Sequence, residues 1–326
     1  MGIPITVISG FLGSGKTTLI NQVIKGSDLA PEEVVIIENE FGEAGIDHEL
    51  LIHSKENIVQ MNGGCICCSL RGDLLNALTA VLDVFVTQDY PIKQVIIETS
   101  GVSDPQPIIQ TIVGTPNLQP YFYLDGVIGV VDAENIEQNL QHHEATKQLV
   151  MSDRLLISQK GVTNKDSMNQ MKEQLKEINP LADIYEFSLI QSSSELADLV
   201  LGNHLFNQSI DDEEEHHHHH HHHHHEFESM IISESGYVKE GLLHNWLSWL
   251  MMNYQESIYR IKGFVNVSDQ DFQTEIQGVN QLLNFNLTNR LTEDNDNKLV
   301  IIGKNIDKDD INQAFQLVIE KSTEGD

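Results

Sequence analysis

The sequence predicts an α/β fold, in which a mainly parallel sheet flanked by helices is followed by a smaller α+β domain. Over about the first 200 residues, short apolar runs alternate with stretches of helical periodicity, which is the pattern of βα units. An acidic and histidine-rich segment then interrupts the pattern, and an amphipathic stretch with several short strand-like runs follows it. We therefore expect a first domain at 1–203, a flexible linker at 204–228 and an α+β domain at 229–326.

Apolar runs of strand length and longer stretches of helical periodicity give the elements of the first domain. The predicted strands cover residues 3–9, 34–38, 58–61, 94–98, 126–131, 154–158 and 183–187. The predicted helices cover residues 17–25, 73–86, 105–113, 136–151, 165–177 and 193–199.

In the second domain, a strand is expected to begin at Met230 and a helix to cover 238–254. The apolar face of that helix contains Trp246 and Trp249, and its amphipathic pattern favours packing over a core rather than insertion in a membrane. Further strands are predicted at 258–267, 272–276, 281–287 and 298–302, and a last helix at 309–320.

The chain is strongly acidic, with a formal net charge of -30, because 49 Asp and Glu oppose 19 Lys and Arg. This balance argues against anionic partners, so neither nucleic acid nor a membrane surface is expected to bind. The N-terminus lacks a secretory signal, and no apolar run is long enough to span a bilayer. These features predict a cytoplasmic protein.

The first predicted strand leads into a complete phosphate-binding loop of the pattern G-x-x-x-x-G-K-T, which opens into a helix. Backbone N–H groups of such a loop surround phosphate oxygens, and the helix N-terminus adds its positive end. Lys16 is expected to reach the β- and γ-phosphates, and Thr17 to offer its hydroxyl to Mg²⁺. The first domain is therefore predicted to be a P-loop NTPase domain. Its expected nucleotide-binding residues here are Gly10, Gly13, Ser14, Gly15, Lys16, Thr17 and Thr18.

Two further segments are expected to meet the triphosphate. Glu98 ends the fourth predicted strand, where a P-loop protein holds its Mg²⁺ directly or through water, and the Gly101 N–H lies at a spacing suited to the γ-phosphate. The polar stretch 39–50 is typical of a loop that a γ-phosphate orders. Within it Asp47 is a candidate for positioning water or contacting the Mg²⁺ shell, although a solvated acidic loop explains it equally well. Lys16, Glu98 and Asp47 form the predicted catalytic set.

All three cysteines of the chain, Cys65, Cys67 and Cys68, fall within four residues after two glycines. Clustered thiolates suit a borderline divalent ion such as Zn²⁺, with Co²⁺ or Ni²⁺ as alternatives. Three sulfurs do not fill a tetrahedral site, so water or the acidic run 38–43 must complete it, with Glu38 and Glu43 as candidates. A redox-active thiol pair and buried apolar cysteines are the other interpretations.

An acidic run at 211–215 precedes ten consecutive histidines. An expression tag is one explanation, but the run is internal and framed by acids, which favours a native low-complexity tether. Tandem imidazoles bind borderline metals in interchangeable arrangements, so the run is predicted to buffer or collect metal. These auxiliary ligands are His216, His217, His218, His219, His220, His221, His222, His223, His224 and His225.

Together, the segments GFLGSGKTT, ENEFGEAGID, GGCICCSLRGDL and IETSGVSDPQPIIQT closely resemble the CobW-like family of GTP-dependent metallochaperones. The resemblance implies GTP hydrolysis coupled to loading or delivery of a divalent metal, usually zinc or cobalt, to client proteins. It also implies that the three cysteines mark the transported-ion site, next to the nucleotide. Oligomerisation that depends on nucleotide or metal is a further expectation.

One departure from the family concerns the nucleobase. The family reads guanine with N/T-K-x-D after the sixth strand, whereas this chain has Gln159, Lys160, Gly161 and Val162 there. Lys160 is retained as a nucleotide-binding candidate, but the carboxylate that accepts from guanine is missing. The sequence therefore predicts triphosphate binding and leaves the choice between GTP and another NTP open.

The leading hypothesis is an NTPase whose nucleotide state gates a thiolate metal site. Lys16, Mg²⁺ and the loop amides would stabilise developing charge on the phosphoryl group without a covalent intermediate. The alternative is a metal storage or buffering protein with weak or vestigial NTPase activity, which the missing carboxylate and the histidine run both favour. A small-molecule kinase is disfavoured, because no acceptor base or substrate lid is recognisable.

Overall fold

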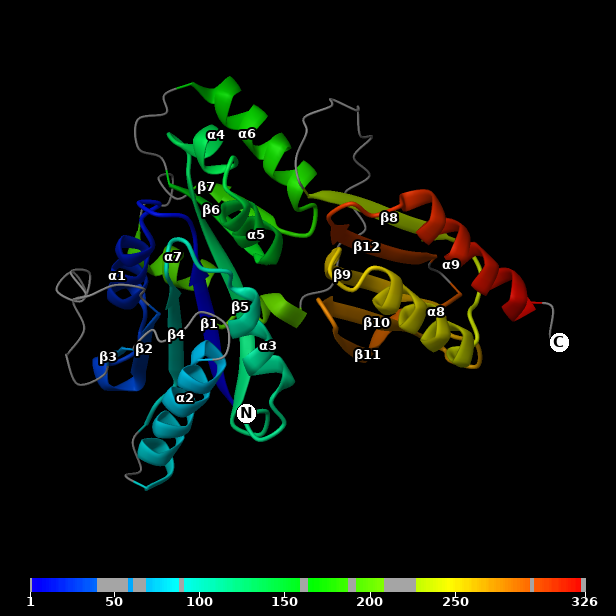
Figure 1. Ribbon diagram of the computed structural model, residues 1–326. Coiled ribbons are helices and arrows are strands. Elements are labelled where there is room, and N and C mark those ends of the chain that lie inside the picture. Colours follow the sequence, from blue (N-terminus) through cyan, green and yellow to red (C-terminus); the bar gives the residue numbers. More distant parts are fainter. Residues whose placement is uncertain are drawn as a thin grey trace. The chain divides into compact units, whose positions relative to one another are not determined.

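The computed structural model describes residues 2–39, 58–60, 69–87, 91–158, 164–186, 192–207, 227–293 and 296–323. The chain forms two compact units, Met1–Glu173 with Ala182–Gln208 and Gln174–Leu181 with Ser209–Asp326. The described strands of each unit form one sheet (Figure 1). In the described ranges, no helix is both long and apolar enough to cross a membrane.

The described strands of the first unit form one parallel sheet in the order β3-β2-β4-β1-β5-β6-β7. Their bounds are β1 Ile3–Ser9, β2 Val34–Asn39, β3 Ile58–Gln60, β4 Gln94–Thr99, β5 Phe122–Asp132, β6 Arg154–Ser158 and β7 Asp183–Glu186. β1 lies between β4 and β5, and its β-branched side chains are buried. The predicted parallel α/β sheet is confirmed, and the carboxyl ends of its strands meet at one edge.

Helices connect these strands. Their bounds are α1 Lys16–Gly26, α2 Ser69–Thr87, α3 Gln106–Gly114, α4 Ile136–Asn139, α5 His143–Met151, α6 Lys165–Ile178 and α7 Ser193–Val200, with short 3₁₀ turns at Pro31–Glu33 and Leu205–Asn207. The apolar sides of α1 and α7 pack on one face of the sheet, where Leu19 and Leu196 share a core with Ile8, Ile36 and Ile96. This packing holds the start of α1 against the carboxyl edge of the sheet.

The predicted single helix over 136–151 is wrong, because the chain forms two helices with a turn between them. The N–H of His142 bonds to the carbonyl of Asn139 at 2.9 Å, and His142 itself is extended. No proline or glycine marks this break, so apolar periodicity runs through it. At this break the ring of His142 stacks on that of Phe11.

A buried carboxylate of β5 forms hydrogen bonds to the segment after α7. Asp125 of β5 is fully buried and accepts hydrogen bonds from Thr6 Oγ1 at 3.2 Å, the Gly202 N–H at 2.9 Å and the His204 N–H at 2.7 Å. His204 adopts a left-handed conformation (φ 51°) and stacks on Tyr123 with ring centroids 5.1 Å apart. Burial, and then the charge of Asp125, raises the pKa of the Tyr123 phenol. Asp125 therefore supplies the bonds that keep this turn in place.

Replacing Asp125 with Ala should lower the free energy of unfolding by about 3 kcal/mol, because two backbone N–H groups lose a charged acceptor. Chemical denaturation monitored by circular dichroism measures the loss. Asp198→Ala, at an exposed position of α7, is the matched control and should change stability by no more than about 0.5 kcal/mol. Equal stability of the two variants would contradict the assigned role of Asp125.

The second unit is an antiparallel sheet with its strands in the order β11-β10-β9-β12-β8. The bounds are β8 Glu228–Glu234, α8 Glu240–Asn253, β9 Ile258–Val265, β10 Phe272–Val279, β11 Leu282–Leu291, β12 Asn297–Gly303 and α9 Lys308–Thr323. α8 and α9 share a core with the sheet, in which Trp246 meets Phe315 edge to face at 4.9 Å. The predicted core role of the tryptophan-containing helix is confirmed.

Candidate functional site

Residues 10–15 join the carboxyl end of β1 to α1, and Lys16 and Thr17 are the first two residues of that helix. Gly13 (φ 78°) and Gly15 (φ 99°) adopt left-handed conformations that favour glycine. At Gly10, an added Cβ would lie 2.5 Å from the carbonyl oxygen of Val130 on β5, so a side chain cannot be accommodated there. All three glycines are thus required by the path of the loop, as a phosphate-binding loop demands.

Two side chains of the loop are buried in positions suited to an anion. The ammonium of Lys16 donates to the carbonyl of Gly10 at 2.9 Å and to that of Phe11 at 3.4 Å, so it lies across the loop. Ser14 Oγ is buried and finds no hydrogen-bond partner within the described part of the chain. A buried hydroxyl normally has a partner, and a phosphate oxygen would supply one. That Gly10, Gly13, Ser14, Gly15, Lys16, Thr17 and Thr18 bind nucleotide stays a prediction.

The helix that follows the loop meets a carboxylate from the neighbouring strand. Thr17 Oγ1 donates to Glu98 Oε1 at 2.9 Å, although the two residues are 81 positions apart. A hydroxyl and a carboxylate are the oxygen ligands that Mg²⁺ accepts. The donor set therefore fits the predicted Mg²⁺ site, which Thr17 would bind directly and Glu98 directly or through water.

The segment after β4 passes close to the phosphate-binding loop. A Cβ added at Gly101 would lie 2.7 Å from Leu12 Cδ2 and 2.8 Å from Leu12 Cα, so the two backbones are in contact. Gly101 is thus placed beside the loop, where its predicted contact with a γ-phosphate requires it to be. The contact itself stays a prediction.

One predicted ligand of the transported metal is described. Glu38, near the end of β2, is buried and is paired in register with Glu98 of β4. Paired residues on parallel strands point to the same face of the sheet, and neighbouring strands lie about 4.8 Å apart. The two carboxylates therefore start from adjacent backbone positions on one face.

The other predicted site residues lie outside the described residues. They are Glu43, Asp47, Cys65, Cys67, Cys68, Lys160 and the histidines His216 to His225. Among the residues that the structure does describe, no group of three or more His, Cys, Asp or Glu is placed to hold a metal ion. Their predicted roles therefore stay predictions.

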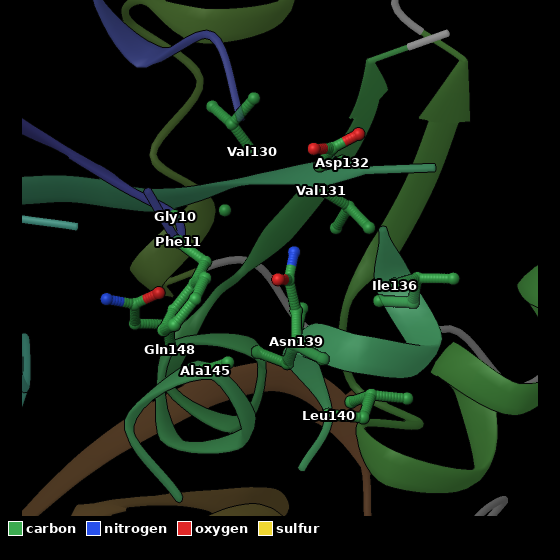
Figure 2. Close-up of a pocket in the computed structure, with 12 residues that line it drawn as sticks. Gly10, Phe11, Val130, Val131, Asp132, Ile136, Asn139, Leu140, Ala145 and Gln148 are labelled. Carbon is green, nitrogen blue, oxygen red and sulfur yellow. The ribbon is translucent and has the colours of Figure 1, made fainter. Parts of the chain in front are cut away.

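A small cavity that is not predicted from the sequence lies at the carboxyl end of β5. Gly10 and Phe11 line it with residues of α4, α5 and β5, among them Asn139 and Gln148 (Figure 2). Its volume of about 20 Å³ holds about one water molecule. Phe11 stacks on His142 with ring centroids 5.1 Å apart and an interplanar angle of 21°. The lining residues Asn139 and Gln148 belong to no motif, which is why the sequence does not reveal the cavity.

A glycine loop between a parallel strand and a helix, with a lysine across it and a strand carboxylate on the following threonine, defines a P-loop nucleotide-binding domain. Residues 4–186 match the model of the CobW/HypB/UreG nucleotide-binding domain, and residues 227–318 match the CobW C-terminal domain. The first match covers more than half of the 326 residues. The chain belongs to the CobW/HypB/UreG family.

Similar proteins include the zinc chaperone YjiA of Escherichia coli, which is 27% identical over 316 residues, or 96% of this chain and 98% of that protein. The zinc chaperone CobW of a Sinorhizobium species is 26% identical over 85% of each chain. The zinc-regulated GTPase metalloprotein activator 1 of Saccharomyces cerevisiae is 31% identical over 56% of this chain and 47% of that protein. The crystal structure of Zn(II)-bound YjiA GTPase superposes with a TM-score of 0.77 at 23% identity, covering 98% of this chain and 99% of that one.

Proposed function

We propose that the protein is a nucleotide-dependent metallochaperone of the GTPase type. It hydrolyses the NTP and uses the nucleotide state to load or deliver a divalent metal, zinc above all, to metal-dependent client proteins. The observation that carries this proposal is the register of β2 and β4, which puts Glu38 beside the carboxylate that bonds to Thr17. Relatives that are named zinc chaperones and a zinc-regulated GTPase support it.

Hydrolysis is assigned to the phosphate-binding loop and to the residues expected beside it, Glu98, Gly101 and Asp47. The Lys16 ammonium donates to the carbonyls of Gly10 and Phe11. When it turns to the β- and γ-phosphate oxygens, water takes its place on these carbonyls. There its charge and the loop amides stabilise the charge that develops on the phosphoryl group. Thr17 and Glu98 would hold Mg²⁺, which supplies neutralising charge to the phosphates. Asp47 is assigned to the attacking water and the Gly101 N–H to the γ-phosphate.

The transported ion is assigned to thiolates and a carboxylate. Cys65, Cys67 and Cys68 are the soft ligands that select zinc, with Co²⁺ or Ni²⁺ as substitutes. Glu38 is the favoured fourth ligand because β2 carries it beside the Mg²⁺ ligand Glu98, and Glu43 is the alternative. A change at either carboxylate is then transmitted directly to its neighbour across two adjacent strands.

A storage or buffering protein with weak NTPase activity is the second candidate function. Two observations favour it, the ten histidines at 216–225 and the lack of the guanine-reading carboxylate beside Lys160. Deleting residues 212–228 separates the candidates, because a chaperone loses only capacity whereas a storage protein loses all of its metal binding. A cytoplasmic location is proposed for either function.

The deciding experiment is zinc affinity measured against a chromophoric chelator with no nucleotide, with Mg²⁺ and GDP, and with Mg²⁺ and a non-hydrolysable GTP analogue. We expect the affinities of the diphosphate and triphosphate states to differ at least about tenfold, a usual size for coupling between two ligands. The same titration with a non-hydrolysable ATP analogue, run in parallel, shows whether guanine is preferred over adenine. Identical zinc titrations in all nucleotide states would contradict the proposed coupling and leave passive zinc sequestration as the function.

A further inference from the structure

The segment between β4 and α3 is tied to helix α5 by one buried side chain. Gln148 Nε2 donates to the carbonyl of Gly101 at 3.3 Å and to that of Ser103 at 3.0 Å. Its side chain is 2% exposed, so water does not compete for these bonds. Both acceptors are backbone atoms, and they lie in the segment predicted to meet the γ-phosphate.

The partners of Gln148 fix which way its amide points. Carbonyl oxygens only accept hydrogen bonds, so the nitrogen must face Gly101 and Ser103, and the oxygen must face away. Gln148 Oε1 is buried without a hydrogen-bond partner in the described ranges, and the residue lines the small cavity beside Gly10 and Phe11 (Figure 2). An unpaired buried acceptor costs stability, so a residue that only filled this space would do so better with an apolar side chain. The amide is therefore explained by the two hydrogen bonds that its Nε2 donates.

Two contacts near Gln148 reinforce the same connection. Lys147 Nζ pairs with Asp104 Oδ2 at 2.9 Å, and Asp104 Oδ1 in turn accepts from the Gln106 N–H at 2.9 Å, at the start of α3. On the other side, His142 stacks on Phe11 of the phosphate-binding loop. Helix α5 and the residue before it thus contact both the loop that surrounds phosphate and the segment that contains Gly101.

We propose that Gln148 is a positioning residue for the triphosphate state. It holds the backbone of Gly101 against Leu12, so that the Gly101 N–H meets the γ-phosphate, and it thereby sets the preference of the site for triphosphate over diphosphate. Binding of a diphosphate does not depend on Gln148, because the β-phosphate is held by the loop itself. This inference rests on the proposed function, since it needs a nucleotide site that distinguishes the two.

The test is Gln148→Met, which keeps the length of the side chain and removes the amide. Dissociation constants are measured with Mg²⁺ for a fluorescent non-hydrolysable GTP analogue and for the matching GDP. We expect the triphosphate to bind about tenfold more weakly and the diphosphate to change by less than about twofold, because only the former uses the positioned N–H. Met151→Ala, which leaves a cavity at a buried position of the same helix, is the control for lost stability. It should leave the ratio of triphosphate to diphosphate affinity unchanged.

The outcomes separate this inference from the proposed function. A folded Gln148→Met variant whose triphosphate-to-diphosphate ratio equals that of the wild type overturns the positioning role. If that variant does not fold, Gln148→Leu, which also removes both donated hydrogen bonds, decides in its place, and an unchanged ratio again overturns the role. A wild type that binds neither nucleotide overturns the proposed function and this inference with it.

Discussion

Replacing Lys16 with Ala is expected to lower kcat for triphosphate hydrolysis by about 10²–10³-fold, the usual cost of removing one stabiliser of transition-state charge. The Lys16 ammonium lies across the phosphate-binding loop and contacts its carbonyls. Hydrolysis needs a positive charge beside the γ-phosphate oxygens, which carry negative charge. Release of inorganic phosphate at saturating nucleotide measures the effect.

The matched control for that variant is Lys25→Ala. It makes the same change in the same helix, but at an exposed position in the last turn of α1, away from the loop. Turnover of the control should stay within about twofold of the wild type, as expected for an exposed position. Comparable turnover of Lys16→Ala and Lys25→Ala would exclude the loop as the place of hydrolysis.

The joint replacement of Cys65, Cys67 and Cys68 by Ser is expected to weaken zinc binding by more than about 100-fold, since losing even an outer-shell partner costs 10–100-fold. A serine hydroxyl is a poor zinc ligand at neutral pH, whereas a thiolate binds zinc strongly. Competition with a high-affinity chelator measures the constant. Glu38→Gln, tested alone, should give a smaller loss in the same direction, because it removes one charged ligand.

Deletion of the ten histidines is the contrasting variant. It should lower the number of zinc ions bound and leave the tightest constant unchanged, because interchangeable imidazoles form a reservoir. The reverse result, with tight binding lost on deletion and kept in the triple serine variant, would identify the histidine run as the principal site and favour storage.

Much of the fold follows from local sequence. The β1 segment Ile3–Ser9 has the predicted bounds because a β-branched run is stopped by glycine, a signal that depends on neighbours alone. Thr17 from the loop motif and Glu98 from its place at a strand end are each expected near Mg²⁺, and the structure brings the two side chains into hydrogen-bond contact.

The failures share a different cause. At the turn between α4 and α5, His142 stacks on Phe11, which lies 131 positions earlier, and this contact has no local signature in the sequence. The bonds of Gln148 to Gly101 and Ser103 cross 47 and 45 positions, and a lone glutamine on a helix gives no hint of them. Side chains that act through backbone groups of a distant segment are found only once the tertiary structure is known.

The strand order separates the two recognition sites that are proposed for this chain. β2, which carries Glu38, and β6, which leads to Lys160, are separated by β4, β1 and β5, or about 19 Å at the spacing of neighbouring strands. On the proposed assignments, the nucleobase and the cargo ion are bound at separate places along the carboxyl edge of the sheet, with the phosphates between them. On the same assignments, a substitution at one of these places leaves the other untouched, so the missing purine-reading carboxylate is compatible with the proposed metal site.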